Sequence, residues 1–192
     1  MKKPSIKKPL KDKTELGSIL GDRVGVRKVN GGVIVTNRPI RKRGKPSAKL
    51  LAQRARFKKA VVYGKRQEAD KEASALYARG IKTKHESVYS VALGDFMNPP
   101  EVKSIDAIYY QGRIDDIIQI EAADDFMVTR VTVTITDGNG GMIEQGLAIE
   151  NLERINSWEY KATASNPTRT GTKIRVIAED KPGNKDQAEI VL

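Results

Sequence analysis

The sequence predicts an α+β chain, in which a basic N-terminal region with a β-hairpin and two or three helices precedes an all-β sandwich of about seven strands. The first indication is a change of charge along the chain. Residues 1–90 carry 25 Lys and Arg against 7 Asp and Glu, a net +18, whereas residues 91–192 carry 10 against 17, a net −7. The second is that the spacing of apolar residues changes after Pro100 from about 3.6 residues, typical of helices, to 2, typical of strands. The third is that turn residues then recur about every 8–12 residues, as in a β-sandwich.

The composition bounds the class of protein. The chain has 192 residues, a formal net charge of +11 and no cysteine. The lack of cysteine excludes disulfide frameworks, thiol nucleophiles and Cys-based zinc sites. No stretch approaches the roughly 20 apolar residues that cross a bilayer, and the opening MKKPSIKKPLKDK lacks the apolar segment of a secretory signal. We therefore expect no membrane partner, and a location in the cytoplasm or in a virion assembled there.

Composition and pattern divide the chain into three parts. Residues 1–16 are rich in Lys and Pro and poor in large apolar side chains, which predicts a flexible basic arm. Residues 17–100 are predicted to form the basic region of hairpin and helices, and residues 101–192 the sandwich. In the second part, GDRVGVRKVNGGVIVTNRP has alternating valines on both sides of Asn30-Gly31-Gly32, which indicates a β-hairpin.

Helix signals follow the hairpin. Ser47 is a good N-cap, and Leu50, Phe57 and Val61 recur on one face, which predicts an amphipathic helix with a basic outer face. We expect Phe57 to pack in a core rather than to serve as a stacking platform. The pattern breaks at Gly64–Arg66, and further helices are predicted over Gln67–Arg79, before Gly80, and over Glu86–Met97, before Asn98-Pro99-Pro100.

Alternating apolar residues then mark the strands of the sandwich, and DGNGG at Asp137–Gly141 marks a turn between two of them. The segment Met142–Ala148 is the predicted return strand. The apolar positions predicted to face the core are Ile118, Ile120, Ala122, Val131, Val133, Ile135, Trp158, Tyr160, Ala162, Ala164, Ile174, Val176, Ala178, Ala188, Ile190 and Leu192.

The end of the chain, WEYKATASNPTRTGTKIRVIAEDKPGNKDQAEIVL, resembles the last strands of bacterial immunoglobulin-like domains, in which a Trp-x-Tyr strand precedes a strand ending in Ala-x-Asp-x-x-Gly-Asn. The matching residues are Trp158, Tyr160, Ala178, Asp180, Gly183 and Asn184. The segment AADDFMVTRVTVTITD also looks like the second and third strands of that family. The resemblance covers about residues 101–192. It implies an immunoglobulin-like sandwich without the inter-sheet disulfide of antibody domains, and it implies a spacer or docking module rather than a particular activity.

A second resemblance covers about residues 17–65. The Gly-Val hairpin, its Arg-Pro exit and the following QRARFKKA are similar to small uncharacterised bacterial proteins. Those relatives have no settled activity, so this resemblance implies no function.

The segment RPIRKRGKPSAKLLAQRARFKK, from Arg38 to Lys59, holds ten Lys or Arg and no acid. We interpret it as a surface that binds polyanions. One alternative is a basic face that contacts only solvent, and another is a surface that docks on acidic protein, including the −7 half of a neighbouring copy. No RNA-recognition, KH or zinc-finger pattern accompanies it. The predicted polyanion-binding residues are Arg38, Arg41, Lys42, Arg43, Lys45, Lys49, Arg54, Arg56, Lys58 and Lys59.

The sequence predicts no catalytic residues, no cofactor and no metal site. His85 is the only histidine, and we expect it to face solvent without a special role. The glycines at 31–32 and 138–141 lack the spacing of phosphate-binding loops and are interpreted as hairpin turns. Several acids stand near predicted strand ends, where they are expected to cap turns, with Ca²⁺ binding as the alternative. These acids are Asp115, Asp116, Asp124, Asp125 and Asp180, and Asp180 is expected to bond the turn that it opens.

Two functions are compatible with these predictions. In the first, the chain is a non-enzymatic structural or docking subunit of a larger assembly, of the phage-particle or injection-machine type. Its basic region would grip an anionic partner, and its sandwich would contact protein subunits, copies of itself among them. In the second, it binds DNA or RNA without sequence specificity and uses the sandwich as a partner module.

Overall fold

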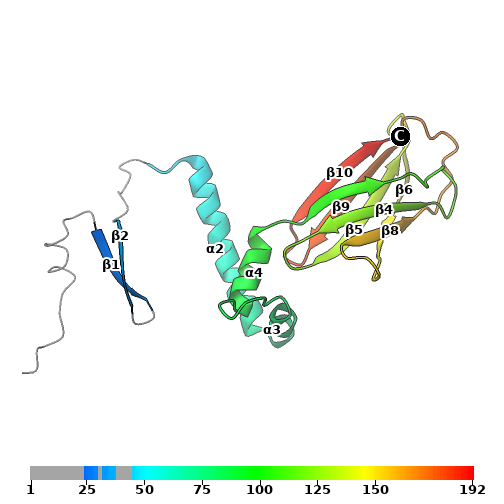
Figure 1. Ribbon diagram of the computed structural model, residues 1–192. Coiled ribbons are helices and arrows are strands. Elements are labelled where there is room, and N and C mark those ends of the chain that lie inside the picture. Colours follow the sequence, from blue (N-terminus) through cyan, green and yellow to red (C-terminus); the bar gives the residue numbers. More distant parts are fainter. Residues whose placement is uncertain (1–23, 30–31, 38–44) are drawn as a thin grey trace, which may run out of the picture. The chain divides into compact units, whose positions relative to one another are not determined.

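The computed structural model describes residues 24–29, 32–37 and 45–192, and it divides into two units, residues 1–46 and 47–192. In the first unit, strands β1 (Val24–Val29) and β2 (Gly32–Asn37) pair antiparallel, with Val29 opposite Gly32 (Figure 1). Both strands of the predicted hairpin are confirmed. The predicted arm, residues 1–16, and the turn at residues 30–31 lie outside the described residues.

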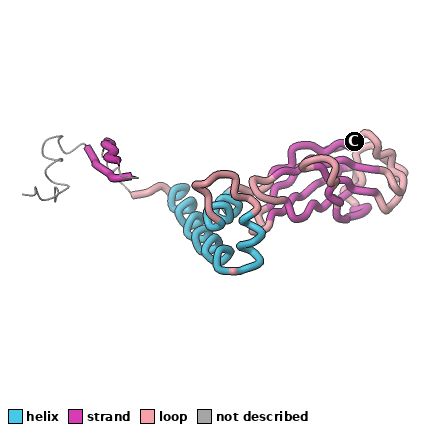
Figure 2. Tube along the Cα trace, turned by 60° about the horizontal axis from the view of Figure 1, so that its bottom comes forward, coloured by secondary structure: helices cyan, strands magenta, loops and turns pink. Residues whose placement is uncertain are grey.

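The second unit begins with three helices, grouped together before the strands in Figure 2. They are α2 (Ala48–Ala69), α3 (Lys71–Ala78) and α4 (Val88–Met97). Each helix begins at a side chain that accepts a hydrogen bond from an otherwise free backbone N–H. Ser47 accepts from Leu50 at 3.3 Å, Asp70 accepts from Ala73 at 2.8 Å, and Ser87 forms a capping box with Ser90. The predicted N-cap at Ser47 is thereby confirmed.

The predicted break between the first two helices is wrong in position. Helix α2 runs through Gly64 to Ala69, and the chain leaves helical geometry only at Asp70, whose φ and ψ are −83° and 126°. Gly64 serves close packing instead. A Cβ at Gly64 would stand 3.0 Å from Cδ2 of Tyr89 on α4. The glycine is therefore what lets α4 approach α2 closely.

Eight strands form two antiparallel four-stranded sheets that make a β-sandwich (Figure 1). The predicted α+β fold with a sandwich is confirmed. One sheet has the order β10-β9-β5-β6 and the other β3-β4-β8-β7. The strands are β3 (Glu101–Asp106), β4 (Ile117–Ala123), β5 (Val128–Thr136), β6 (Met142–Leu147), β7 (Ile149–Glu150), β8 (Ser157–Lys161), β9 (Lys173–Asp180) and β10 (Lys185–Val191).

The core lies between the two sheets and is made mainly of the residues that the alternation predicts. The β4, β5 and β9 side chains at the predicted positions are all buried, as are Trp158 and Tyr160 on β8. Ile190 and Leu192, near the C-terminus, are half-buried and pack against this core. Strand β3, which the alternation did not predict, pairs with β4 and contributes half-buried Val102 and Ile105 to the same cluster.

Polar groups buried in the sandwich are almost fully bonded. Glu144 on β6 accepts hydrogen bonds from the Tyr160 hydroxyl at 2.9 Å and from the Thr163 backbone N–H at 2.8 Å. The amide of buried Asn166 donates to the Thr172 hydroxyl at 2.8 Å, and the Asn166 backbone N–H donates to the Gly112 carbonyl at 2.8 Å. Such bonds offset the cost of removing these groups from water.

The contact between Gly112 and Asn166 leads to a stability prediction. Gly112 has φ +83°, and an added Cβ would stand 2.1 Å from the Asn166 carbonyl oxygen. Gly140 has a similar φ of +87° but open space around it, so it is a matched control. We expect Gly140→Ala to lower the free energy of unfolding by about 1 kcal/mol, for the left-handed backbone alone. We expect Gly112→Ala to cost about 2 kcal/mol more, because the backbone of residue 166 must move. Urea unfolding measures both, and equal losses would contradict the close approach.

Candidate functional site

The first three turns of α2 are exposed within the second unit, residues 47–192. Every side chain from residue 48 to residue 59 is exposed, and burial begins only at Ala60. The first half of α2 is exposed and the second half is partly buried because helices α3 and α4 pack against the second half. There, Tyr63 contacts Tyr77 and Phe96, with ring centroids 6.5 and 5.3 Å apart. Within residues 47–192, the first half of α2 is therefore an exposed helical surface, and we call residues 48–59 the exposed segment of α2.

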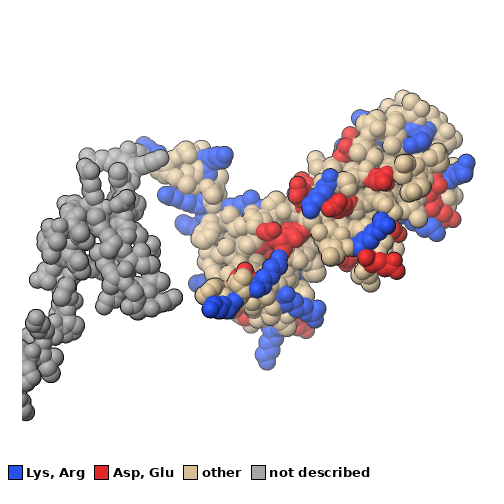
Figure 3. Space-filling view, in the orientation of Figure 1, with Lys and Arg blue, Asp and Glu red and all other residues tan. Residues whose placement is uncertain are grey.

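The exposed segment is strongly basic. Residues 45–66 include eight Lys and Arg and no Asp or Glu. Figure 3 shows blue Lys and Arg side chains along α2, with uncharged side chains between them. With no acid nearby, the positive potentials add rather than cancel, which attracts an anionic partner and raises its local concentration.

The structure describes six of the ten predicted polyanion-binding residues. Lys45 precedes α2, and the other five stand on the exposed segment: Lys49, Arg54, Arg56, Lys58 and Lys59. Arg38, Arg41, Lys42 and Arg43 lie outside the described residues. One helix therefore gathers the five cations on a single rigid rod, a placement that suits binding to an extended anionic surface.

The prediction that the apolar stripe of this helix packs in a core is wrong for its first half. Leu50 is 38 % exposed, Leu51 52 %, Phe57 49 % and Val62 66 %. Val61, one turn further, is half-buried. The periodicity correctly identified side chains that share a face, but no described element covers that face before Ala60. Exposed large apolar groups interleaved with cations are typical of a binding surface rather than of an inert solvated helix.

A shallow pocket continues this surface toward the packed half of α2. Its volume is about 370 Å³, and it is lined by Lys58, Lys59, Val62, Tyr63 and Arg66. Val62 and the Tyr63 ring supply the apolar part of this lining, and Lys58, Lys59 and Arg66 supply three cations. Such a pocket fits a side chain that combines an apolar body with an anionic end.

Of the acids near strand ends, Asp116, Asp124 and Asp180 cap turns as expected. Asp116 accepts from the backbone N–H groups of Gln111 and Arg113 at 2.6 and 2.8 Å, which lowers the pKa of Asp116. Asp180 accepts from the Asn184 backbone N–H at 2.6 Å, as predicted for the turn that it opens. Asp115 pairs with Lys161 at 3.0 Å, and Asp125 accepts from the Asn98 amide at 2.6 Å.

Two of these acids also meet a third that the sequence did not single out. Asp124, in the turn between β4 and β5, and Asp180, at the end of β9, converge on Asp95 of α4. One carboxylate oxygen from each lies within 4.8 Å of the others. Asp95 and Asp180 are 1 % and 2 % exposed. Among the described residues this is the one group of three or more acids or histidines with such geometry.

The environment of Asp95 disfavours its charge. Burial raises the pKa of Asp95 to about 7; the hydrogen bond from the Tyr77 hydroxyl acts in the opposite direction, and the charges of Asp124 and Asp180 raise the pKa further. Burial likewise raises the pKa of Asp180, against the hydrogen bonds from Asn184. Tyr77 is itself buried, and its ring stacks on Phe126 with centroids 4.4 Å apart. Helix α4, helix α3 and two turns of the sandwich thus meet around these carboxylates.

Three further features of the described residues complete the description of the chain. His85 is exposed in the loop between α3 and α4, as expected. Asp137 accepts from the backbone N–H groups of Asn139 and Gly141, both at 2.8 Å, which confirms a hairpin turn there. Within the part of the chain that the structure describes, each helix is too short or too polar to span a membrane.

Comparison with known proteins adds little to this geometry. No protein-family model matches the chain. No curated protein matches it either. Among solved structures, CopC from Methylosinus trichosporium OB3b is similar over 47 % of this chain and 87 % of its own, with 10 % sequence identity and a TM-score of 0.35. The assignment of a two-sheet β-sandwich therefore rests on the strand pairing described above.

Proposed function

We propose that this protein is a non-enzymatic structural subunit of a larger assembly, and that the exposed segment of α2 docks on an acidic surface of a neighbouring subunit. The observation that carries the proposal is the combination of cations with exposed Leu50, Leu51 and Phe57 on one uncovered helix. An immunoglobulin-like sandwich, the type that residues 158–184 resemble, suits the role of a docking module. A phage particle or an injection-type machine is an assembly of the expected kind.

Charge complementarity supports a second copy of this chain as the neighbouring subunit. Residues 1–90 carry 25 Lys and Arg against 7 acids, whereas residues 91–192 carry 10 against 17. Contact between the basic part of one copy and the acidic part of the next is heterologous, and repetition of such a contact produces rings or filaments. This arrangement is what a structural subunit requires.

The exposed apolar residues favour a protein partner over nucleic acid. Phosphate groups are bound by cations and need no apolar contact. A protein interface, in contrast, is centred on large apolar side chains and places its charges at the rim. Phe57 and the two leucines would form that centre, and Arg54, Arg56 and Lys58 its rim.

A second candidate function is sequence-nonspecific binding of DNA or RNA. It is favoured by the run of eight Lys and Arg without an acid over residues 45–66. A basic helix exposed on all sides is also narrow enough to enter the DNA major groove, which is about 12 Å wide. In this case affinity would fall steeply with salt and would not depend on the apolar residues.

The proposal is tested by sedimentation velocity on the full chain at low and high salt. We expect association that grows with protein concentration and weakens as salt screens the charges over a Debye length of about 3 Å at 1 M. A fluorescent duplex of random sequence is titrated in parallel. A chain that stays monomeric at high concentration and co-purifies with no particle would contradict the structural role, and tight salt-dependent binding of the duplex by that monomer would favour the second function.

Replacing the exposed apolar residues separates the two functions. We expect Leu50→Ser, Leu51→Ser and Phe57→Ser together to abolish self-association and to leave duplex binding within about twofold, because phosphate contacts involve only the cations. The matched control compares Ile81→Ser with Leu50→Ser, since both side chains are 38 % exposed and Ile81 lies outside α2 and outside the acidic half. Equal loss of association in these two single variants would show that the effect is not specific to α2.

A further inference from the structure

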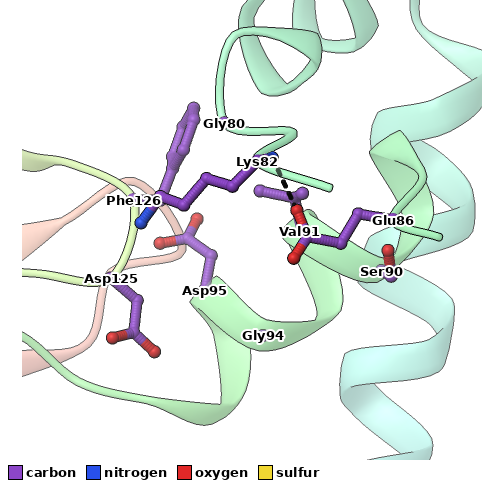
Figure 4. A pocket seen from close by; sticks show the side chains of 9 residues that line it. All are labelled: Gly80, Lys82, Glu86, Ser90, Val91, Gly94, Asp95, Asp125 and Phe126. Atoms are coloured by element: carbon purple, nitrogen blue, oxygen red, sulfur yellow. Dashed lines mark hydrogen bonds between the residues drawn. The ribbon is translucent and has the colours of Figure 1, made fainter. Parts of the chain in front are cut away.

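The carboxylates of Asp95, Asp124 and Asp180 lie outside the docking surface and form a separate cluster of acids. They come from segments far apart in the sequence: α4, the β4–β5 turn and the end of β9. Figure 4 shows the Asp95 side chain beside Phe126 and Asp125 in a pocket that Gly94 and Lys82 also line. The volume of this pocket is about 230 Å³. Of the three carboxylates, Asp95 lines this pocket.

Counting hydrogen bonds shows which carboxylate oxygens lack a partner. Both oxygens of Asp180 accept from Asn184, at 2.6 and 2.7 Å. Oδ2 of Asp124 accepts from the Phe126 and Met127 backbone N–H groups at 3.2 and 3.0 Å, and Oδ2 of Asp95 accepts from the Tyr77 hydroxyl. Oδ1 of Asp95 and Oδ1 of Asp124 are buried and have no partner. Buried carboxylate oxygens without a partner are costly, so a proton on Asp95 or a bound cation is needed to satisfy them.

No described side chain supplies the missing positive charge. None of the ion pairs among the described residues involves Asp95, Asp124 or Asp180. Lys82 lines the same pocket without forming one of these pairs. Two oxygens of these three carboxylates therefore have no hydrogen-bond partner, and no ion pair among the described residues neutralises the cluster.

We propose that Asp95, Asp124 and Asp180 bind one Ca²⁺ ion. Calcium takes oxygen ligands at about 2.3–2.6 Å, so two ligands on opposite sides of the ion stand about 4.8 Å apart. The three carboxylate oxygens all lie within 4.8 Å of one another. Water entering through the pocket would supply the remaining ligands. The site offers oxygen alone, which suits a hard cation and not zinc or copper.

A bound ion would join the helices to the sandwich, since Asp95 belongs to α4 and the other two ligands belong to the sandwich. Existing contacts already bring these parts together. The Asn184 amide donates to the backbone carbonyls of Asp95 and Phe96, both at 3.3 Å, and Tyr77 stacks on Phe126. Calcium would therefore act as a structural clamp at this junction, independent of the docking function.

The test is thermal unfolding of the full chain after treatment with a chelator, with and without added CaCl₂ at constant ionic strength. We expect a saturable rise of the midpoint, by about 5–10 °C at a hundredfold excess over the dissociation constant. Titration calorimetry should give one ion per chain. MgCl₂ is titrated in the same way, and a smaller rise is expected because Mg²⁺ sheds its water reluctantly.

Variants locate the ion. We expect Asp95→Asn and Asp124→Asn each to remove the calcium-dependent rise, whereas Asp115→Asn should keep it. Asp115 is the matched control, because the change of charge is the same and its side chain is 70 % exposed and paired with Lys161. Asp124→Asn keeps a side-chain oxygen that can accept the hydrogen bonds of the turn, so this variant is expected to fold. Circular dichroism checks that its secondary structure is unchanged. No rise with either cation, or an equal rise in all three variants, would overturn the proposal.

Discussion

Neutralising Arg54, Arg56, Lys58 and Lys59 together, each to Gln, is expected to weaken self-association by one to two orders of magnitude at low salt. Each exposed ion pair contributes about 0.2–1 kcal/mol, so four lost together cost about 0.8–4 kcal/mol, and one to two orders of magnitude is the middle of that range. Glutamine is close to Arg and Lys in helix propensity, so α2 is expected to remain folded. Sedimentation velocity across a salt series measures the loss, which should shrink as salt rises.

The control for this variant carries the same change of charge elsewhere. Lys84, Arg154, Arg169 and Lys173 are all exposed, and none belongs to α2. Replacing these four with Gln lowers the net charge equally but should leave association nearly unchanged. If both variants lose association to the same extent, net charge rather than the exposed segment controls docking.

The second large effect concerns pH. In chelator-treated protein, the free energy of unfolding is expected to fall as pH rises from about 4 to about 7. The folded pKa of Asp95 is about 7 and its ordinary value is 3.8, so the folded state binds the proton more tightly than the unfolded state in this window. One pKa unit corresponds to 1.36 kcal/mol, so the difference of about three sets an upper bound of roughly 4 kcal/mol on this loss. Below pH 4 and above pH 7 Asp95 contributes no further change.

The groups that face Asp95 explain this direction. Burial disfavours its charge most, and Asp124 and Asp180 repel it, whereas the Tyr77 hydroxyl stabilises the carboxylate. Lys82 lines the same pocket. Urea unfolding at pH 4 and pH 8 in the presence of a chelator measures the loss in the natural chain and in Asp95→Asn. The variant cannot ionise at position 95, so its pH dependence should be flatter, and an identical dependence would contradict the role of Asp95.

The parts of the fold that were predictable depend on local patterns. Ile118 and Ile120, or Val131 and Val133, alternate with polar neighbours, and a strand places such residues on one face whatever surrounds it. Ser47 was recognisable as an N-cap because it bonds a backbone group only three residues away. In the candidate site, the basic character of α2 could be read directly from composition.

What could not be predicted depends on contacts between distant segments. The period of α2 shows that Leu50 and Phe57 share a face, but it does not show that α3 and α4 cover only the second half of the helix. Asp95 was missed because its neighbours Asp124 and Asp180 are 29 and 85 positions away. Gly64 looked like a helix break, since glycine is a poor helix former, and only the approach of Tyr89 reveals its packing role.

Photo-cross-linking from position 57 tests the docking surface most directly. Phe57 is replaced by photoreactive benzoylphenylalanine in the full chain, and isotopically heavy and light copies are mixed before irradiation. If the exposed segment of α2 docks on a second copy, heavy–light cross-links will join position 57 to peptides of residues 101–192. Cross-links confined to single copies, or none at concentrations where the chain associates, would contradict the central claim that this helix is the docking surface.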